Sequence, residues 1–133
     1  MKILLDTNIC IYIIKRKPQA VLQRFYTYQI GDVSVSSITV AELEFGVRKS
    51  QFPEQNQQAL TQFLLTLAIV DFDSTAANAY GVIRAELEKR GTPIGSLDTL
   101  IAAHALSLGT TLITNNVKEF GRVPGLKLEN WVD

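Results

Sequence analysis

The sequence contains one cysteine, Cys10, and one histidine, His104. A single cysteine forms no internal disulfide, which excludes a disulfide-stabilised secreted scaffold and agrees with a reducing compartment. The same scarcity leaves no His/Cys set with the spacing of a zinc site. We expect Cys10 to be a small buried apolar residue, since a catalytic thiol needs a basic partner. We expect His104 to be a packing residue with a satisfied hydrogen bond.

Long hydrophobic runs are also lacking. The opening residues 1–6 have no extended apolar segment with a small-residue cleavage site, so they do not resemble a signal peptide. No apolar run approaches the roughly 20 residues that cross a bilayer. We therefore expect a cytoplasmic protein without a membrane association.

There is no surplus of charge of either sign, because 13 Lys and Arg balance 13 Asp and Glu. A protein that coats nucleic acid usually has a basic surplus, but acidic residues gathered in a site would leave basic residues free at its rim. The candidates for phosphate contact, each of which is equally a solvated helix end, are Lys15, Arg16, Lys17, Lys89, Arg90, Lys118 and Arg122.

The composition is that of an ordinary globular protein, with 47% hydrophobic and 20% charged residues. The length fits one compact domain over residues 1–133. Short β-branched or apolar runs alternate with helical patterns, and no repeat or linker separates them. The pattern predicts strands at about 2–5, 33–36, 68–72, 110–114 and 126–128. It predicts helices at about 8–15, 18–29, 37–49, 53–67, 75–90 and 98–108, with a turn or short helix at 115–121.

This alternation predicts an α/β fold with a mainly parallel sheet and helices on both faces. Such sheets place their sites at the carboxyl ends of the strands. Asp6 follows the first strand, Glu42 lies within a helix, and Asp98 begins a helix after a Gly/Pro loop. Taken singly, each has a plainer interpretation, Asp6 and Asp98 as helix caps and Glu42 as a surface residue. Their joint placement favours a shared site.

All three acids are embedded in apolar sequence, where a carboxylate is costly unless it is paired or bound to a cation. Several carboxylates together raise one another's pKa, and a bound metal lets them all stay ionised. Hard cations such as Mg²⁺ prefer oxygen ligands and can activate water for phosphodiester hydrolysis. We therefore predict that Asp6, Glu42 and Asp98 hold Mg²⁺, with Mn²⁺ as a substitute.

Four segments together resemble the PIN-domain nucleases, and specifically the VapC-type toxins of bacterial toxin–antitoxin pairs. The resemblance covers essentially the whole chain, in order and at fitting spacings. The segments are Leu5–Asn8, Ser36–Gly46, Pro93–Ala105, and Leu112–Asn116 followed by Glu119–Phe120 and Val123–Leu126.

The resemblance implies an α/β/α sandwich and a Mg²⁺- or Mn²⁺-dependent endoribonuclease that cleaves structured RNA. For the subgroup that this sequence resembles, the implied substrate is initiator tRNA, which is cut in the anticodon loop. It implies a homodimer and inhibition by a VapB antitoxin whose tail enters a groove of the toxin. It also implies assembly of the complex on operator DNA through the antitoxin.

One position departs from the family pattern, because many PIN domains have Asp where this sequence has Asn116. Asn116 offers a carbonyl oxygen without charge, and the neighbouring Glu119 is expected to supply the fourth catalytic carboxylate. Thr7, Asn8 and Thr114, together with Asn116, are expected to orient the carboxylates. With three certain acids, both one-metal and two-metal mechanisms stay open.

Three other classes of protein share some of these features. A phosphatase of the haloacid-dehalogenase type would need a second Asp at the position of Asn8. A receiver-type signalling domain would need a Lys after the late strand, where 114–116 is Thr-Asn-Asn. An inactive PIN domain that only binds RNA or a partner is disfavoured by the intact Asp6, Glu42 and Asp98.

Overall fold

A computed structural model describes residues 2–132, which form a five-stranded sheet and seven helices. The strands are β1 (Ile3–Leu5), β2 (Val33–Ser36), β3 (Ala68–Val70), β4 (Thr111–Ile113) and β5 (Leu128–Glu129). The helices are α1 (Thr7–Lys15), α2 (Gln19–Phe25), α3 (Ser37–Arg48), α4 (Pro53–Leu64), α5 (Ser74–Lys89), α6 (Ser96–Leu108) and α7 (Val117–Phe120).

The sheet has the strand order β3-β2-β1-β4-β5, and every neighbouring pair is parallel. This confirms the expected parallel α/β fold. Because all strands run the same way, their carboxyl ends meet at one edge. At that edge Leu5 of β1 pairs with Ile113 of β4, so the residues that follow them, Asp6 and Thr114, come out side by side.

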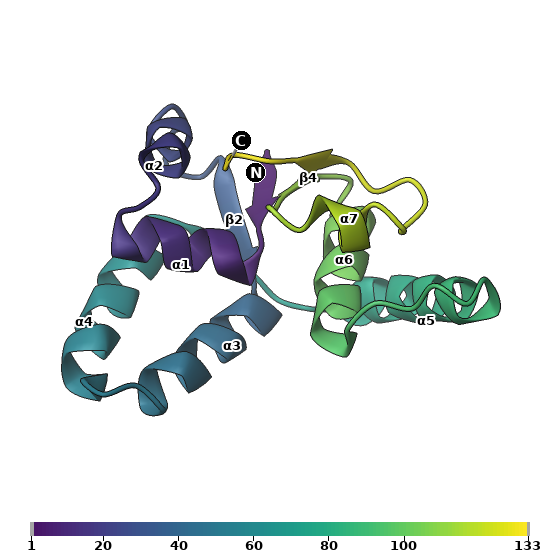
Figure 1. The fold of residues 1–133 in the computed structure, drawn as a ribbon, viewed down its shortest axis with the longest axis horizontal. Coiled ribbons are helices and arrows are strands. Elements are labelled where there is room, and N and C mark those ends of the chain that lie inside the picture. The colour runs from purple at the N-terminus through teal and green to yellow at the C-terminus, as the bar shows by residue number, and fades with distance from the viewer. Residues whose placement is uncertain (1, 133) are drawn as a thin grey trace.

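Helices cover both faces of the sheet and create two separate cores, which confirms the α/β/α sandwich. Figure 1 shows α1 to α4 gathered on one side and α5 with α6 on the other. Along β1, Ile3 and Leu5 pack into the first core, while Leu4 packs into the second. This alternation is the period of two that a strand imposes.

The first helix is capped by one of the predicted site residues. The side chain of Asp6 accepts the backbone N–H of Ile9 at 2.8 Å, so Asp6 is the N-cap. The hydroxyl of Thr7 is used elsewhere, in a bond to Glu42. The side chains of Ser36 and Asp73 cap α3 and α5 in the same way.

Several predicted boundaries were wrong by two or more residues, and three of them have a clear local reason. Helix α2 ends at Phe25 instead of 29, where the backbone turns. Helix α4 ends at Leu64 instead of 67, because the hydroxyl of Thr66 bonds the carbonyl of Phe63. Strand β5 begins at Leu128 instead of 126, since Gly125, at φ 80°, turns the chain there.

No helix between residues 2 and 132 is long and apolar enough to span a bilayer.

Candidate active site

Asp6 is the most buried acid of the site, with 4% of its surface exposed. Its carboxylate accepts the N–H of Ile9 and a hydrogen bond from the Thr114 side chain. Burial raises the pKa of Asp6 from 3.8 to about 6 in spite of these bonds, and the charges of Asp98 and Glu42 add to the rise. Both acids therefore lie close enough to Asp6 to interact with it electrostatically.

Glu42 is held in place from helix α1. The Thr7 hydroxyl donates to Oε1 of Glu42 at 2.8 Å, and the same hydroxyl lies 3.4 Å from Oγ1 of Thr39. Thr39 is fully buried and Glu42 is half-buried. This hydrogen bond supports the predicted role of Thr7 in orienting a carboxylate. Thr39 was missed by sequence reasoning, although it lies three residues before Glu42 on the same helix face.

The other two acids, Asp98 and Glu119, are in contact across the start of α6 and the short α7. Burial raises the pKa of Asp98, and the charges of Glu119 and Glu42, followed by a hydrogen bond to the Glu119 carboxyl, raise it further. Asn116 donates from Nδ2 to Oε2 of Glu119 at 3.2 Å. Asn116 thus orients an acid instead of supplying one.

Thr114 connects the two halves of the site. Its side chain bonds Asp6, and its Oγ1 accepts the backbone N–H of Asn116 at 3.0 Å. The four acids predicted from the sequence are therefore brought together at the carboxyl edge of β1 and β4. Asn8 is not part of this arrangement, since its side chain is exposed and has no hydrogen bond within the described chain.

The donor chemistry of this cluster suits a hard divalent cation. No three His, Cys, Asp or Glu side chains between residues 2 and 132 lie close enough to enclose a metal by themselves. Mg²⁺, however, keeps several waters and needs only one or two direct carboxylates. A cation beside Asp6 and Asp98 would offset the carboxylate repulsion that helps raise both pKa values.

The predicted RNA-binding residues differ in their surroundings. Lys15 is exposed at the far end of α1, about 13 Å along the helix from Asp6, and Arg16 and Lys17 are exposed directly after it. Lys118 is exposed on α7, directly before Glu119. Arg122 is engaged within the protein, because its Nη1 donates to the carbonyl of Pro93 at 3.0 Å.

His104 and Cys10 lie in the interior, as expected. Nδ1 of His104 is 2.7 Å from Oγ of Ser36, which confirms the expected hydrogen bond, whereas Nε2 has no hydrogen-bond partner within residues 2–132. Burial lowers the pKa of His104 and raises that of Cys10. Neither side chain bonds a carboxylate of the acid cluster, although the backbone N–H of Cys10 bonds the carbonyl of Asp6 at 3.2 Å and the charge of Asp6 contributes to the Cys10 shift.

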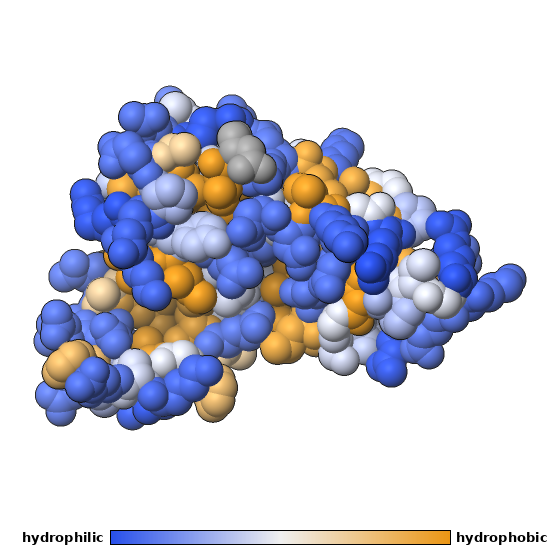
Figure 2. Space-filling model, viewed as in Figure 1, coloured by the Kyte–Doolittle hydropathy of each residue, from blue (hydrophilic) through white to orange (hydrophobic). Residues whose placement is uncertain are grey.

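A groove of about 450 Å³ runs between α1, α3 and α4, with Glu42 among its lining residues. Its walls are mostly apolar, and Lys15 and Lys49 also line it. Figure 2 shows this apolar surface in the hollow at the lower left of the molecule. The groove was not located by sequence reasoning, since it depends on how three helices pack.

Comparison with known proteins adds the family. The PIN domain matches residues 3–126. The chain is 47% identical over 131 residues to a protein of Shigella flexneri named tRNA(fMet)-specific endonuclease VapC, and 98% of each chain is covered. It is 50% identical over 132 residues to a Haemophilus influenzae protein named ribonuclease VapC2, with 99% of each covered.

A solved structure gives the same relationship. The crystal structure of DNA-bound VapBC from Salmonella typhimurium contains a chain that matches with a TM-score of 0.93 and 44% identity, covering 98% of both chains. The family match, the two relatives and this fold agree with one another. The chain therefore belongs to the PIN-domain family and, within it, to the group of VapC proteins.

Proposed function

We propose that this protein is the toxin of a toxin–antitoxin pair, an endoribonuclease that cleaves structured RNA and depends on Mg²⁺ or Mn²⁺. Its substrate is initiator tRNA, cut in the anticodon loop. The name of the Shigella relative, tRNA(fMet)-specific endonuclease, supports this substrate.

The observation that carries the proposal is the convergence of four carboxylates at one edge of a parallel sheet. Asp6 interacts with Asp98 and Glu42, and Asp98 is in hydrogen-bond contact with Glu119. No basic side chain is among the causes that shift the pKa of either aspartate. A cluster of this kind is suited to a divalent cation.

Asp6, Glu42 and Asp98 would hold the cation, with Glu119 at the edge of the site. When bound, the cation supplies charge stabilisation and activates water for attack on phosphate. Neighbouring side chains position the carboxylates. Thr7 fixes Glu42, Thr114 fixes Asp6 and Asn116 fixes Glu119 through hydrogen bonds.

In the proposed reaction, the oxygen of a water molecule forms a bond to phosphorus and the bond from phosphorus to the 3′ oxygen breaks. One carboxylate of the cluster takes the water proton, and the leaving oxygen is protonated. The products carry a 5′-phosphate and a 3′-hydroxyl. Lys15, Arg16, Lys17 and Lys118 contact phosphates of the bound RNA through their exposed ammonium and guanidinium groups.

The partner is a VapB antitoxin, which keeps the enzyme inactive and carries the complex to operator DNA. The likeness to a DNA-bound VapBC complex supports this partner. We place the antitoxin tail in the apolar groove between α1, α3 and α4, because an occupant there would lie beside Glu42. The toxin forms a homodimer in the assembly.

The test is to sequence RNA ends after brief expression of the protein and of its Asp6→Ala variant, together with cleavage of purified initiator tRNA. We expect cuts in the anticodon loop with the wild type and none with the variant. EDTA should abolish the purified activity, and Mg²⁺ or Mn²⁺ should restore it. Full cleavage by the variant, or in excess EDTA, would contradict the proposal.

A further inference from the structure

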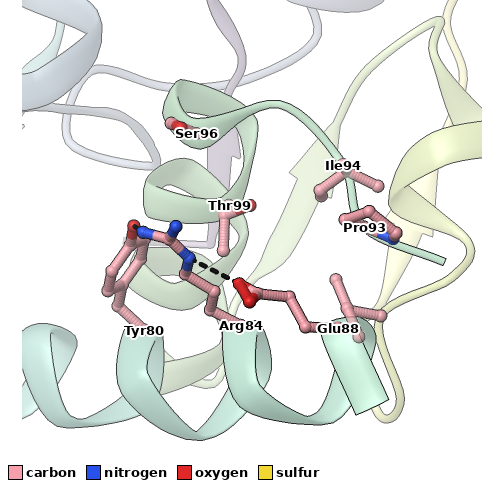
Figure 3. A pocket seen from close by; sticks show the side chains of 8 residues that line it. Tyr80, Arg84, Glu88, Pro93, Ile94, Ser96 and Thr99 are labelled. Atoms are coloured by element: carbon pink, nitrogen blue, oxygen red, sulfur yellow. Dashed lines mark hydrogen bonds and ion pairs between the residues drawn. The ribbon is translucent and has the colours of Figure 1, made fainter. Parts of the chain in front are cut away.

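A second pocket, of about 370 Å³, lies between α5 and the start of α6. Figure 3 shows Tyr80, Arg84 and Glu88 on the α5 wall, facing Ile94, Ser96 and Thr99 on the other. None of these six side chains belongs to the acid cluster or to the groove that contains Glu42. The pocket therefore lies outside the groups that carry the proposed reaction.

The α5 wall is polar but has little net charge. Nε of Arg84 donates to Oε2 of Glu88 at 2.9 Å, and Nη1 donates to the Tyr80 hydroxyl at 2.9 Å. The guanidinium also lies 6.0 Å from the centre of the Tyr80 ring. Because Glu88 already balances the charge of Arg84, the pocket suits a flat neutral group with polar edges better than a phosphate.

The pocket lies next to the acid cluster, on the opposite side of one helical turn. Ser96 and Thr99 line it, and Asp98 lies between them in sequence but faces the cluster. An α-helix with its side chains is about 10–12 Å across, so the pocket and the acid cluster are separated by roughly this distance. The exposed segment from Gly95 to Leu97 forms the short path between the two sites.

We propose that this pocket binds a nucleobase of the RNA substrate that flanks the cut phosphate, and that it favours guanine. The inference rests on the proposed ribonuclease function. Unpaired RNA bases are recognised by stacking on aromatic rings or guanidinium planes and by hydrogen bonds to their edges. Tyr80 and Arg84 supply the planes, and Glu88 supplies the edge contact.

The preference for guanine follows from the carboxylate. Glu88 uses Oε2 for Arg84, and Oε1 is able to accept a further N–H. The guanine edge presents two adjacent N–H donors, at N1 and N2, whereas uracil presents one N–H between two carbonyl oxygens. A carboxylate therefore attracts the guanine edge and repels the carbonyl oxygens of uracil.

Helix α5 offers a matched control for the test. It carries two ion pairs of i,i+4 spacing, Arg84–Glu88 in the pocket and Glu86–Arg90 outside it. Glu88→Gln and Glu86→Gln each remove one carboxylate from an exposed pair on the same helix. Exposed pairs contribute little to stability, so both variants should fold and melt alike.

The experiment measures cleavage of hairpin RNAs in which the base at each position around the cut is varied. We expect wild type and Glu86→Gln to prefer guanine over uracil at one flanking position by about tenfold, in line with the strength of single base contacts. Glu88→Gln should lose this preference through a raised KM, with preferences at other positions unchanged. Equal preferences in the two variants would overturn the inference.

A binding measurement separates this inference from the proposed function. Fluorescence anisotropy with Asp6→Ala, alone and combined with Glu88→Gln or Glu86→Gln, reports base preference without cleavage. A preference that depends on Glu88 supports the pocket even if wild type cuts no RNA. A Glu88→Gln effect confined to oligomeric state, measured by light scattering, would overturn it and assign the pocket to contact with a second copy.

Discussion

Asp6 has two roles in the fold, and they have opposite effects on stability. It caps α1 through Ile9, and it is a buried carboxylate among other carboxylates. The raised pKa of about 6 means that the folded chain binds the Asp6 proton more tightly than the unfolded chain does. Protonation therefore stabilises the fold, and ionisation destabilises it.

We predict that Asp6→Asn stabilises the metal-free protein near neutral pH. The stabilisation from the protonated acid is complete below about pH 4 and is lost as the pH rises to about 6, which leaves a cost on the order of 3 kcal/mol above it. Asn keeps an oxygen for the cap without the charge. Thermal unfolding in EDTA across this pH range checks the prediction.

The difference in stability between variant and wild type should grow through that pH window and then level off. Added Mg²⁺ should raise the melting temperature of wild type more than that of Asp6→Asn, because the metal offsets the same repulsion. A difference that does not change with pH would show that the Asp6 carboxyl is not destabilised by burial in the folded chain.

Arg122 and Lys118 look alike in the sequence but differ in their contacts. Arg122 bonds the carbonyl of Pro93, in the loop that leads to Asp98, while its backbone N–H bonds the carbonyl of Glu119. Lys118 is exposed. The structure therefore favours a positioning role for Arg122, which joins the segments that carry two of the acids.

We predict that Lys118→Ala lowers the salt dependence of RNA binding by about one unit of log–log slope, as loss of one phosphate contact does. Arg122→Ala should leave that slope unchanged but lower kcat about tenfold and raise the Mn²⁺ concentration needed for binding without RNA. Arg122→Gln, which keeps an N–H donor, should recover much of the loss. An equal decrease in the salt-dependence slope in both alanine variants would instead indicate that Arg122 contacts a phosphate.

At the level of elements, the short helix α7 depends on the glycine that follows it. A Cβ at Gly121 would lie 2.6 Å from the carbonyl oxygen of Val117, a clash with backbone that cannot move away cheaply. A Cβ at Gly81, in the middle of α5, would meet nothing within 4 Å. A side chain at position 121 would therefore clash with the backbone, whereas a side chain at position 81 has room.

We predict that Gly121→Ala destabilises the protein by about 1–3 kcal/mol and lowers cleavage, because α7 and Glu119 are displaced. Gly81→Ala should stabilise it by up to about 1 kcal/mol, since alanine favours a helix over glycine. Urea unfolding and a cleavage assay distinguish the two. Unchanged stability and activity in Gly121→Ala would mean that the turn after α7 adapts freely.

The order of the strands and helices was predictable because each element has its own local pattern. The β1 run of apolar residues stops at Asp6, and Pro53 and Gly109 mark helix ends. Asp6 and Asp98 were predictable because they lie near the starts of helices that follow a strand or a loop, whereas Glu42, within α3, was predicted from the apolar residues around it. The contacts between elements were not, since Thr39 beside Thr7, or Arg122 beside Pro93, depends on packing of segments far apart in sequence.

For the molecule as a whole, the groove and the acid cluster are connected through Glu42, which belongs to both. An antitoxin segment in the groove would therefore lie against a residue of the reaction centre. Gly46 lies one turn after Glu42 in the groove wall, and a Cβ there would have no neighbour within 4 Å. A large side chain at this position has room to enter the groove.

We predict that Gly46→Trp weakens neutralisation by the antitoxin by at least tenfold and preserves most RNA cleavage, because it fills the groove and leaves the four acids in place. Gly81→Trp, equally bulky on a helix that does not line the groove, is the matched control. The measurements are antitoxin affinity by calorimetry, and growth of cells that express both proteins. Wild-type affinity in Gly46→Trp would exclude the groove as the antitoxin site, since a segment bound there could not avoid the indole ring.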